Sequence, residues 1–144
     1  MKKTGFRADG KWLLTFLFAV ISFSLALAYA MAQEAQQGWQ APADATQVKN
    51  PIPTDRTSTD AGKKIFTGKC LSCHGSLGKG DGPMCKILKK KPGDLTSATV
   101  QAQTDGSLFW KITKGQTPMP TFGKSLTDKE RWNVVNYIRT LAAK

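Results

Sequence analysis

The chain has 144 residues, with 21 Lys and Arg against 10 Asp and Glu, a formal net charge of +11, three cysteines and one histidine. This length suits one small domain, whose modest core often needs a covalent link or a cofactor, and excludes a large multidomain enzyme. A basic chain favours an acidic protein partner, an anionic membrane surface or nucleic acid, and charge alone does not choose among them.

Residues 1–32 have the pattern of an export segment. Basic residues precede an apolar run that starts at Trp12, and small-residue cleavage sites end at Ala30 and Ala32. The run exceeds the ~7–15 residues of a typical signal core and approaches the ~20 needed to span a bilayer. We expect a cleaved signal peptide or a retained anchor, with membrane association through residues 12–32 in the second case. The remaining chain is then periplasmic or on the outer face of the cytoplasmic membrane, where nucleic acid is not a partner.

Residues 33–57 are rich in Ala, Gln, Pro and Thr and show neither a helical nor a strand period. Their prolines favour extended backbone, so they are predicted to form a linker or a loosely wrapped arm. The ordered domain is predicted to cover residues 58–144. Its first helix is expected to have Thr59 as its N-cap and to run into Cys70. A glycine-rich loop and one or two helical turns over residues 83–91 follow.

Two further helices are expected in the second half of the chain. A short helix capped by Thr104 or Asp105 should stop at Gly115. The last helix begins with a capping box formed by Thr127 and Glu130. No segment has a convincing strand pattern. The sequence therefore predicts an all-α domain of three to four helices joined by glycine- and proline-rich loops.

Cys70, Cys73 and His74 form a Cys-x-x-Cys-His run, which is a signature of covalent haem attachment. Cysteines three apart lie on neighbouring turns of a helix, so each sulfur can add to one vinyl group of a porphyrin. His74 projects from the same face and is the only histidine in the chain. The pattern predicts one covalently bound haem c, held by Cys70 and Cys73, with His74 as the proximal ligand of its iron.

Two other interpretations of these residues stay open. One is a disulfide or redox dithiol, which leaves the histidine unexplained. The other is a zinc site with three sulfurs and one nitrogen, drawn from Cys70, Cys73, His74 and Cys85. A zinc site would require one short turn to direct three ligands onto one ion. Cys85 is otherwise expected to be a small buried apolar residue, with a thiol that pairs between chains as the lesser alternative.

Because the chain has no second histidine, the sixth position of the iron is left to a methionine, a lysine, water or no ligand. Met119 is the candidate among these. It lies between Pro118 and Pro120, which fix φ and hold a loop rigidly without secondary structure. The alternative role for such a methionine is to fill a gap in the core. Met84 follows Pro83 near the attachment motif and is expected to lie near the haem ring.

Residues 58–143 closely resemble the class I (monohaem) c-type cytochromes, and most of all the bacterial subgroup related to the haem-bearing subunits of cbb3-type oxidases. The resemblance rests on "GKKIFTGKCLSCHGSLGKGDGP", "KPGDLT", "TDGSLFWKITKGQTPMPTFGKSLT" and "RWNVVNYIRTL", which occur in family order. It implies a small cytochrome c fold around one haem c, thioether bonds at both cysteines of the motif, and axial ligation of the iron by His74 and Met119.

The same resemblance implies three supporting roles. The carbonyl of Pro83 would accept a hydrogen bond from the ring N–H of His74, which fixes the tautomer and raises the basicity of the ligand. The first and last helices would cross where Gly62 and Phe66 meet two aromatic residues, Trp132 and Tyr137. Cys85 departs from the family, in which a small residue such as Ala is more usual.

The predicted function is that of an exported electron carrier between respiratory redox partners, without enzymatic activity. One alternative is a membrane-tethered haem subunit of a respiratory oxidoreductase, in which residues 33–58 would let the haem swing between donor and acceptor. Another is a haem enzyme or gas-binding protein with an open distal site.

A basic cluster near the attachment motif is the candidate docking surface for an acidic redox partner. Its members are Lys69, Lys79, Lys86, Lys89, Lys90 and Lys91. A solvated face without a binding role is the alternative reading of the same charges.

Overall fold

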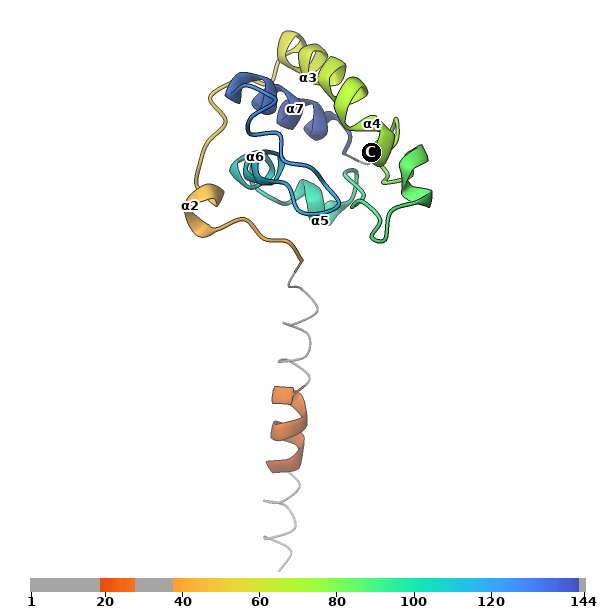
Figure 1. Cartoon of the computed structure of the whole chain (residues 1–144). Helices are drawn as coiled ribbons and strands as arrows, with labels where there is room; N and C mark the ends of the chain where they lie inside the picture. The colour runs from red at the N-terminus through yellow and green to blue at the C-terminus, as the bar shows by residue number, and fades with distance from the viewer. Residues whose placement is uncertain (1–18, 28–37, 143–144) are drawn as a thin grey trace, which may run out of the picture. The chain divides into compact units, whose positions relative to one another are not determined.

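The computed structural model describes residues 19–27 and 38–142 (Figure 1). The chain divides into two compact units, Met1–Gln40 and Ala41–Lys144. In the first unit, residues 19–27 are helical. Within the two described ranges, no helix combines the length and the apolar character that crossing a membrane requires. Much of the predicted export segment lies outside the described residues, so its cleavage or retention stays a prediction.

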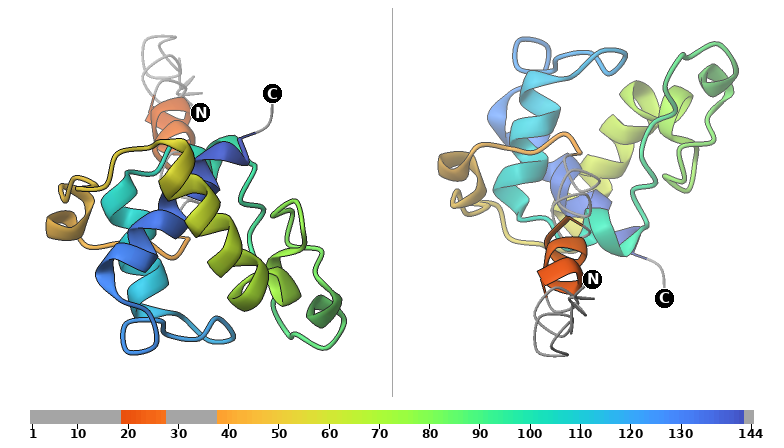
Figure 2. Two further views of the ribbon diagram at one scale, coloured as in Figure 1. Left: turned by 90° about the horizontal axis from the view of Figure 1, so that it is seen from above. Right: turned by 90° about the horizontal axis from the view of Figure 1, so that it is seen from below.

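The second unit is built from helices. The three longest are α3 (Arg56–Lys69), α6 (Asp105–Lys114) and α7 (Asp128–Thr140). Four shorter elements complete the described part of this unit. One, α2 (Ala43–Thr46), precedes α3, and the others lie between α3 and α6, namely α4 (Leu71–His74), the 3-10 turn η1 (Pro83–Lys86) and α5 (Ala98–Gln101). Figure 2 shows α3 crossing α7. Over the described part of this unit, the all-α prediction is confirmed.

The start of α3 differs from the prediction. Asp55 is the N-cap in place of Thr59, because its side chain accepts a hydrogen bond from the Ser58 amide at 2.7 Å. The Ser58 hydroxyl completes the capping box by accepting from the Asp55 amide at 3.2 Å. Thr59 lies inside the helix, where its hydroxyl donates back to the Asp55 carbonyl at 2.9 Å. Ser58, at the third helical position, therefore occupies the place in the capping box where Glu or Gln is usual.

The later helix ends agree with the sequence. Thr104 caps α6, which ends at Gly115, and Thr127 with Glu130 forms the capping box of α7. The short helix α5 was not predicted. It begins after Ser97, whose side chain accepts a hydrogen bond from the amide of Val100.

The hydrophobic core lies mainly on α6 and α7. Its buried members are Leu108, Ile112, Phe122, Leu126, Trp132, Val134, Val135 and Ile138. The rings of Phe109 and Trp132 stack with their centroids 4.0 Å apart. Arg131 is buried beside them, with its guanidinium 4.8 Å from the centre of the Phe109 ring. The apolar face of α7 is thus covered by α6 and by the segment between these two helices.

Gly62 is the point of closest approach between α3 and α7. A Cβ atom added there would lie 1.9 Å from the carbonyl oxygen of Asn133. One turn later, the buried ring of Phe66 lies 5.1 Å from that of Tyr137, centroid to centroid. The predicted contact of this crossing with Tyr137 is therefore present, whereas Trp132 stacks on Phe109 instead. The crossing works because glycine lets two backbones approach closely.

The segment predicted as a linker belongs in large part to the second unit. Residues 41–57 lie within that unit, and Ile52 packs against the core. Asn136 of α7, which is fully buried, hydrogen-bonds with this segment through its side-chain amide. The compact unit therefore begins near Ala41 rather than near Ser58, and the swinging tether of the membrane-bound alternative is shorter than the sequence suggested.

Replacing Gly62 by alanine is expected to destabilise the protein by about 1–3 kcal/mol, because the new methyl group would force α3 away from α7. Gly68→Ala is the matched control on the same helix, where an added Cβ has no atom within 4 Å. It should be neutral or stabilising by up to about 1 kcal/mol, since alanine favours a helix over glycine. Urea unfolding of the haem-containing protein measures both. Equal stability of the two variants would contradict the close crossing.

Candidate functional site

The Cys-x-x-Cys-His motif lies on a turn that continues α3. Cys70 ends α3, and its amide donates to the Phe66 carbonyl at 2.8 Å. The next turn, α4, is closed by hydrogen bonds from the amides of Cys73 and His74 to the Cys70 carbonyl, at 3.2 and 2.9 Å. Gly75 ends this turn with φ of 78°, a conformation that favours glycine. The structure thus brings the three predicted residues together on consecutive helical turns.

The thiols of the motif are free in the structure, as is that of Cys85. Both motif cysteines are half-buried. Burial, with a further contribution from the charge of Cys73, raises the pKa of the Cys70 thiol to about 11. Within residues 19–27 and 38–142, no cluster of three or more His, Cys, Asp or Glu side chains is placed to hold a metal ion.

His74 is the polar group of the site with an unmet requirement. Its Nδ1 atom is buried and has no hydrogen-bond partner. Burial lowers the pKa of His74, and a hydrogen bond with the Gly93 backbone partly opposes this shift. The imidazole is consequently neutral at pH 7, which is the form that binds a metal. A half-buried, neutral imidazole beside two cysteine side chains fits an iron porphyrin attached at this motif.

The glycine-rich loop folds back over the motif. The Gly80 amide donates to the His74 carbonyl at 2.8 Å, and the Gly82 amide donates to the Cys73 carbonyl at 3.1 Å. A Cβ atom on Gly82 would lie 2.4 Å from the Ser72 carbonyl oxygen, so this approach requires glycine. The loop therefore holds the backbone of His74 from one side, and Pro83 follows at the start of η1. Its predicted hydrogen bond with His74 stays a prediction, since Nδ1 has no partner here.

Cys85 contacts the backbone of this loop. Its sulfur lies 3.0 Å from the carbonyl oxygens of both Cys73 and Gly80. The side chain is half-buried rather than fully buried as expected. A thiol directed at two backbone carbonyls is consistent with a structural residue of the loop.

Met119 lies on a separate loop, between α6 and α7. Its amide donates to the Gln116 carbonyl at 2.7 Å, which closes a tight turn around Pro118. The side chain is half-buried and packs against the core. The loop is tied to the end of α6 by the Phe122 amide, which donates to the Ile112 carbonyl at 3.1 Å. Met119 and His74 thus lie on different segments of the chain. The role of Met119 as the second axial ligand of the iron stays a prediction.

Two features near the site were missed by sequence reasoning. Gly93 of the "KPGDLT" landmark contacts His74 through its backbone, and sequence patterns carry no signal for a backbone contact between distant loops. Asn136 anchors the segment before α3. A polar residue among the apolar positions of α7 was an available signal for such an anchor.

Comparison with known proteins agrees with the geometry. Residues 57–138 match the family model of the cytochrome c oxidase, cbb3-type, subunit III. Cytochrome c6 of Rippkaea orientalis is 40% identical over 81 residues, which cover 54% of this chain and 66% of the relative, slightly less than two thirds. Cytochrome c6 of Parathermosynechococcus lividus is 31% identical over 84 residues, which cover 58% of this chain and 90% of the relative.

Solved structures show the same fold. A chain of the Kuenenia stuttgartiensis reducing HAO-like protein complex superposes with a TM-score of 0.60 at 32% identity, over 67% of this chain and half of that chain. The KustC0563 c-type cytochrome superposes with a TM-score of 0.51 at 25% identity, over 57% of this chain and 98% of that chain. The predicted class I cytochrome fold is confirmed.

The family match, the cytochrome relatives and the grouping of Cys70, Cys73 and His74 on one turn agree on one cofactor. The chain therefore belongs to the cbb3-type subunit III family of c-type cytochromes, as a monohaem class I member that carries one covalently attached haem c with its iron.

Proposed function

We propose that this chain is an exported electron carrier that transfers single electrons between respiratory redox proteins. The observation that carries the proposal is the turn from Cys70 to His74, which places two cysteines and the only histidine of the chain together. Its cytochrome c6 relatives and its family match support the same role. In this reading the protein has no catalytic residues.

Each residue of the motif would hold the cofactor in a different way. Each thiol, of Cys70 and of Cys73, would add across a vinyl group, so that a sulfur–carbon bond forms and the thiol hydrogen moves to the neighbouring carbon. His74 would present a nitrogen lone pair to the iron on the proximal side. Pro83 would accept the other ring N–H and so orient the imidazole. The chemistry supplied by bound haem is one-electron oxidation and reduction of iron.

Met119 would complete the ligand set from the distal side. A thioether is a soft ligand, and ligation by His and Met raises the reduction potential of haem. The turn around Pro118 limits the movement of this side chain. With both axial positions filled, the iron has little access to a substrate. The enzyme or gas-binding alternative requires Met119 to leave the iron.

The membrane-tethered alternative depends on residues 12–32 remaining in the mature protein. N-terminal sequencing of the purified protein separates it from a free carrier. A terminus at Met31 or Gln33 would exclude retention of the anchor.

The proposed docking surface is the lysine cluster around the motif. All six lysines are exposed, Lys69 before the motif, Lys79 in the glycine-rich loop, and Lys86, Lys89, Lys90 and Lys91 in and after η1. Complementary charge on a partner would raise the rate of association more than the affinity of the complex. An acidic redox protein is the partner chemistry that fits this surface.

Met119→Ala is expected to keep the covalent haem, lower the reduction potential and allow the reduced protein to bind carbon monoxide. The physical reason is that the sixth position of the iron would lose its thioether. Met84→Ala is the matched control, because Met84 is 41% exposed and its sequence position favours packing near the ring. Potentiometry and carbon monoxide titration measure both. If Met84→Ala shows the effects instead, the ligand assignment is wrong.

The double variant Cys70→Ala with Cys73→Ala is expected to be largely unfolded or degraded. The loops at residues 75–82 and 116–122 have few regular hydrogen bonds, and a small core without its cofactor is marginal. Cys85→Ala is the control and should retain haem and fold. Circular dichroism decides the outcome, since a cooperative thermal transition of the double variant without haem would contradict the prediction.

Oxidation by ferricyanide, a small trianion, is expected to slow as ionic strength rises. Lys89→Gln with Lys90→Gln should reduce the rate at low salt by roughly 2- to 10-fold, because local positive charge attracts the anion. Lys124→Gln with Lys129→Gln changes the net charge equally and is the control. Stopped-flow rates measure both pairs. Equal effects would show that net charge, rather than the proposed surface, governs encounter.

A further inference from the structure

We propose that residues 41–55, here called the strap, position the loop that carries Met119. The strap precedes α3 and lies outside residues 57–138, the part matched by the family model. The inference rests on the proposed role of Met119 as an iron ligand. It adds a positioning element that acts on that ligand from outside the haem site.

One end of the strap is fixed to α7 by a buried amide. Asn136 is 0% exposed, and its Oδ1 accepts hydrogen bonds from Asn50 Nδ2 at 2.7 Å and Thr54 Oγ1 at 3.1 Å. Its Nδ2 donates to the carbonyl oxygens of Ile52 and Pro53, at 3.3 and 3.1 Å. Asn136 Nδ2 also donates to the Ser58 hydroxyl of α3 at 3.0 Å. If the strap moved away, this buried amide would lose both partners of its Oδ1 atom and two of the three partners of its Nδ2 atom. The strap is therefore part of the folded unit.

The other end of the strap lies against the start of α6. Figure 1 shows α2 beside α6. A Cβ atom on Gly106, in the first turn of α6, would lie 2.1 Å from the Ala45 carbonyl oxygen and 2.6 Å from that of Val48. Only glycine allows the two backbones to approach so closely. The strap therefore contacts α6 closely at Gly106.

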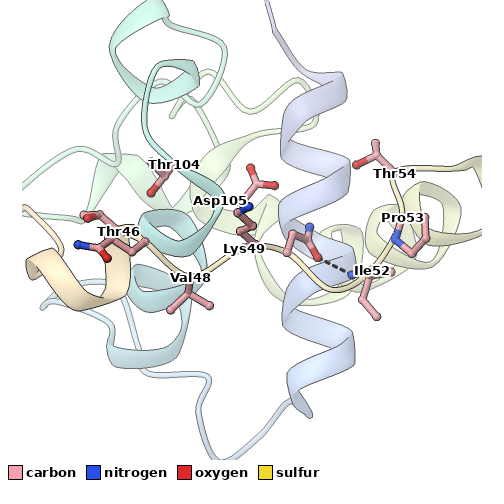
Figure 3. Close-up of a pocket in the computed structure, with 10 residues that line it drawn as sticks. Thr46, Val48, Lys49, Ile52, Pro53, Thr54, Thr104 and Asp105 are labelled. Atoms are coloured by element: carbon pink, nitrogen blue, oxygen red, sulfur yellow. Dashed lines mark hydrogen bonds between the residues drawn. The ribbon is translucent and has the colours of Figure 1, made fainter.

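Next to that contact, the strap and α6 are not tightly packed. Strap residues together with Thr104 and Asp105 line a cavity of about 550 Å³ (Figure 3). Within the strap, Asn50 Oδ1 accepts a hydrogen bond from the Ile52 amide at 2.9 Å. The strap thus holds the start of α6 through the Gly106 contact, with space beside it into which the helix end could shift.

The far end of α6 is bonded to the loop of Met119. The Phe122 and Gly123 amides donate to carbonyls of Ile112 and Thr113, both at 3.1 Å. The Thr121 hydroxyl donates to the Thr113 carbonyl at 2.6 Å. An α-helix of 10 residues is a rigid rod of about 15 Å. A shift of α6 at Gly106 would therefore also move the loop. By preventing this shift, the strap would keep Met119 in place.

The test compares Gly106→Ala with Gly38→Ala in the full-length ferric protein with its haem. At Gly38 an added Cβ has no atom within 4 Å, so the same chemical change has nothing to displace. Alanine favours the helix more than glycine does, so an effect at Gly106 cannot come from a weaker α6. The readouts are hydrogen exchange over residues 41–55 and the affinity for cyanide, which binds ferric iron when the methionine leaves.

Gly106→Ala is expected to increase exchange in the strap and to raise the cyanide affinity about fivefold, the equilibrium equivalent of one net hydrogen bond. Gly38→Ala should match the unmodified protein. Asn50→Ala, which removes the hydrogen bonds of the Asn50 side chain with Asn136 and with the Ile52 amide, should act in the same direction. It keeps the test valid if Gly106→Ala fails to fold.

Faster strap exchange with unchanged cyanide affinity would overturn the coupling to Met119. Unchanged strap exchange in both variants would overturn the docking contacts themselves. If the unmodified protein lacks the spectrum of methionine-ligated low-spin haem, the ligand assignment is wrong, and the coupling fails with it. If that spectrum is present but both variants bind cyanide with unchanged affinity, only the coupling is wrong.

Discussion

The close approach of α3 to α7 at Gly62 is the constraint on which the haem site depends. It fixes the direction of α3, and α3 leads without a break into the turn that carries Cys70. Phe66 connects the crossing to the site, because its buried ring lies 5.1 Å from Tyr137 on one side and 6.4 Å from His74 on the other. The position of the histidine is therefore set by packing between helices as well as by the motif.

The polar side chains in and near the core meet their hydrogen-bonding requirements to different degrees. Asn136 has hydrogen bonds for its whole amide, and Arg131 is paired with Asp128 and lies over the Phe109 ring. Three buried side-chain atoms of the described residues have no hydrogen-bond partner, namely His74 Nδ1, Arg131 Nε and Asn133 Oδ1. An unsatisfied buried group costs about 1–3 kcal/mol. Of these three residues, only His74 is one that the motif predicts to bind the haem iron.

The two sides of the proposed haem site are supported in different ways. On the side of His74, backbone hydrogen bonds from Gly80 and Gly82 hold the motif in a short, local structure. On the side of Met119, the loop depends on α6, which in turn is held by α7 and by the segment before α3. Local contacts define the attachment side, and contacts between segments far apart in sequence define the other.

The sequence by itself determined the all-α class, the caps of α6 and α7, and the haem-attachment motif, because each depends on residues within a few positions of one another. Capping boxes are local hydrogen bonds, and the spacing of Cys70, Cys73 and His74 is a property of one helical turn. Only the tertiary structure decided that residues 41–55 belong to the folded unit, that Trp132 stacks on Phe109, and that Gly93 contacts His74. These contacts join segments that are distant in sequence. A buried amide, an aromatic ring or a backbone carbonyl meets such a partner only after the helices have packed, so local sequence patterns do not reveal the contact.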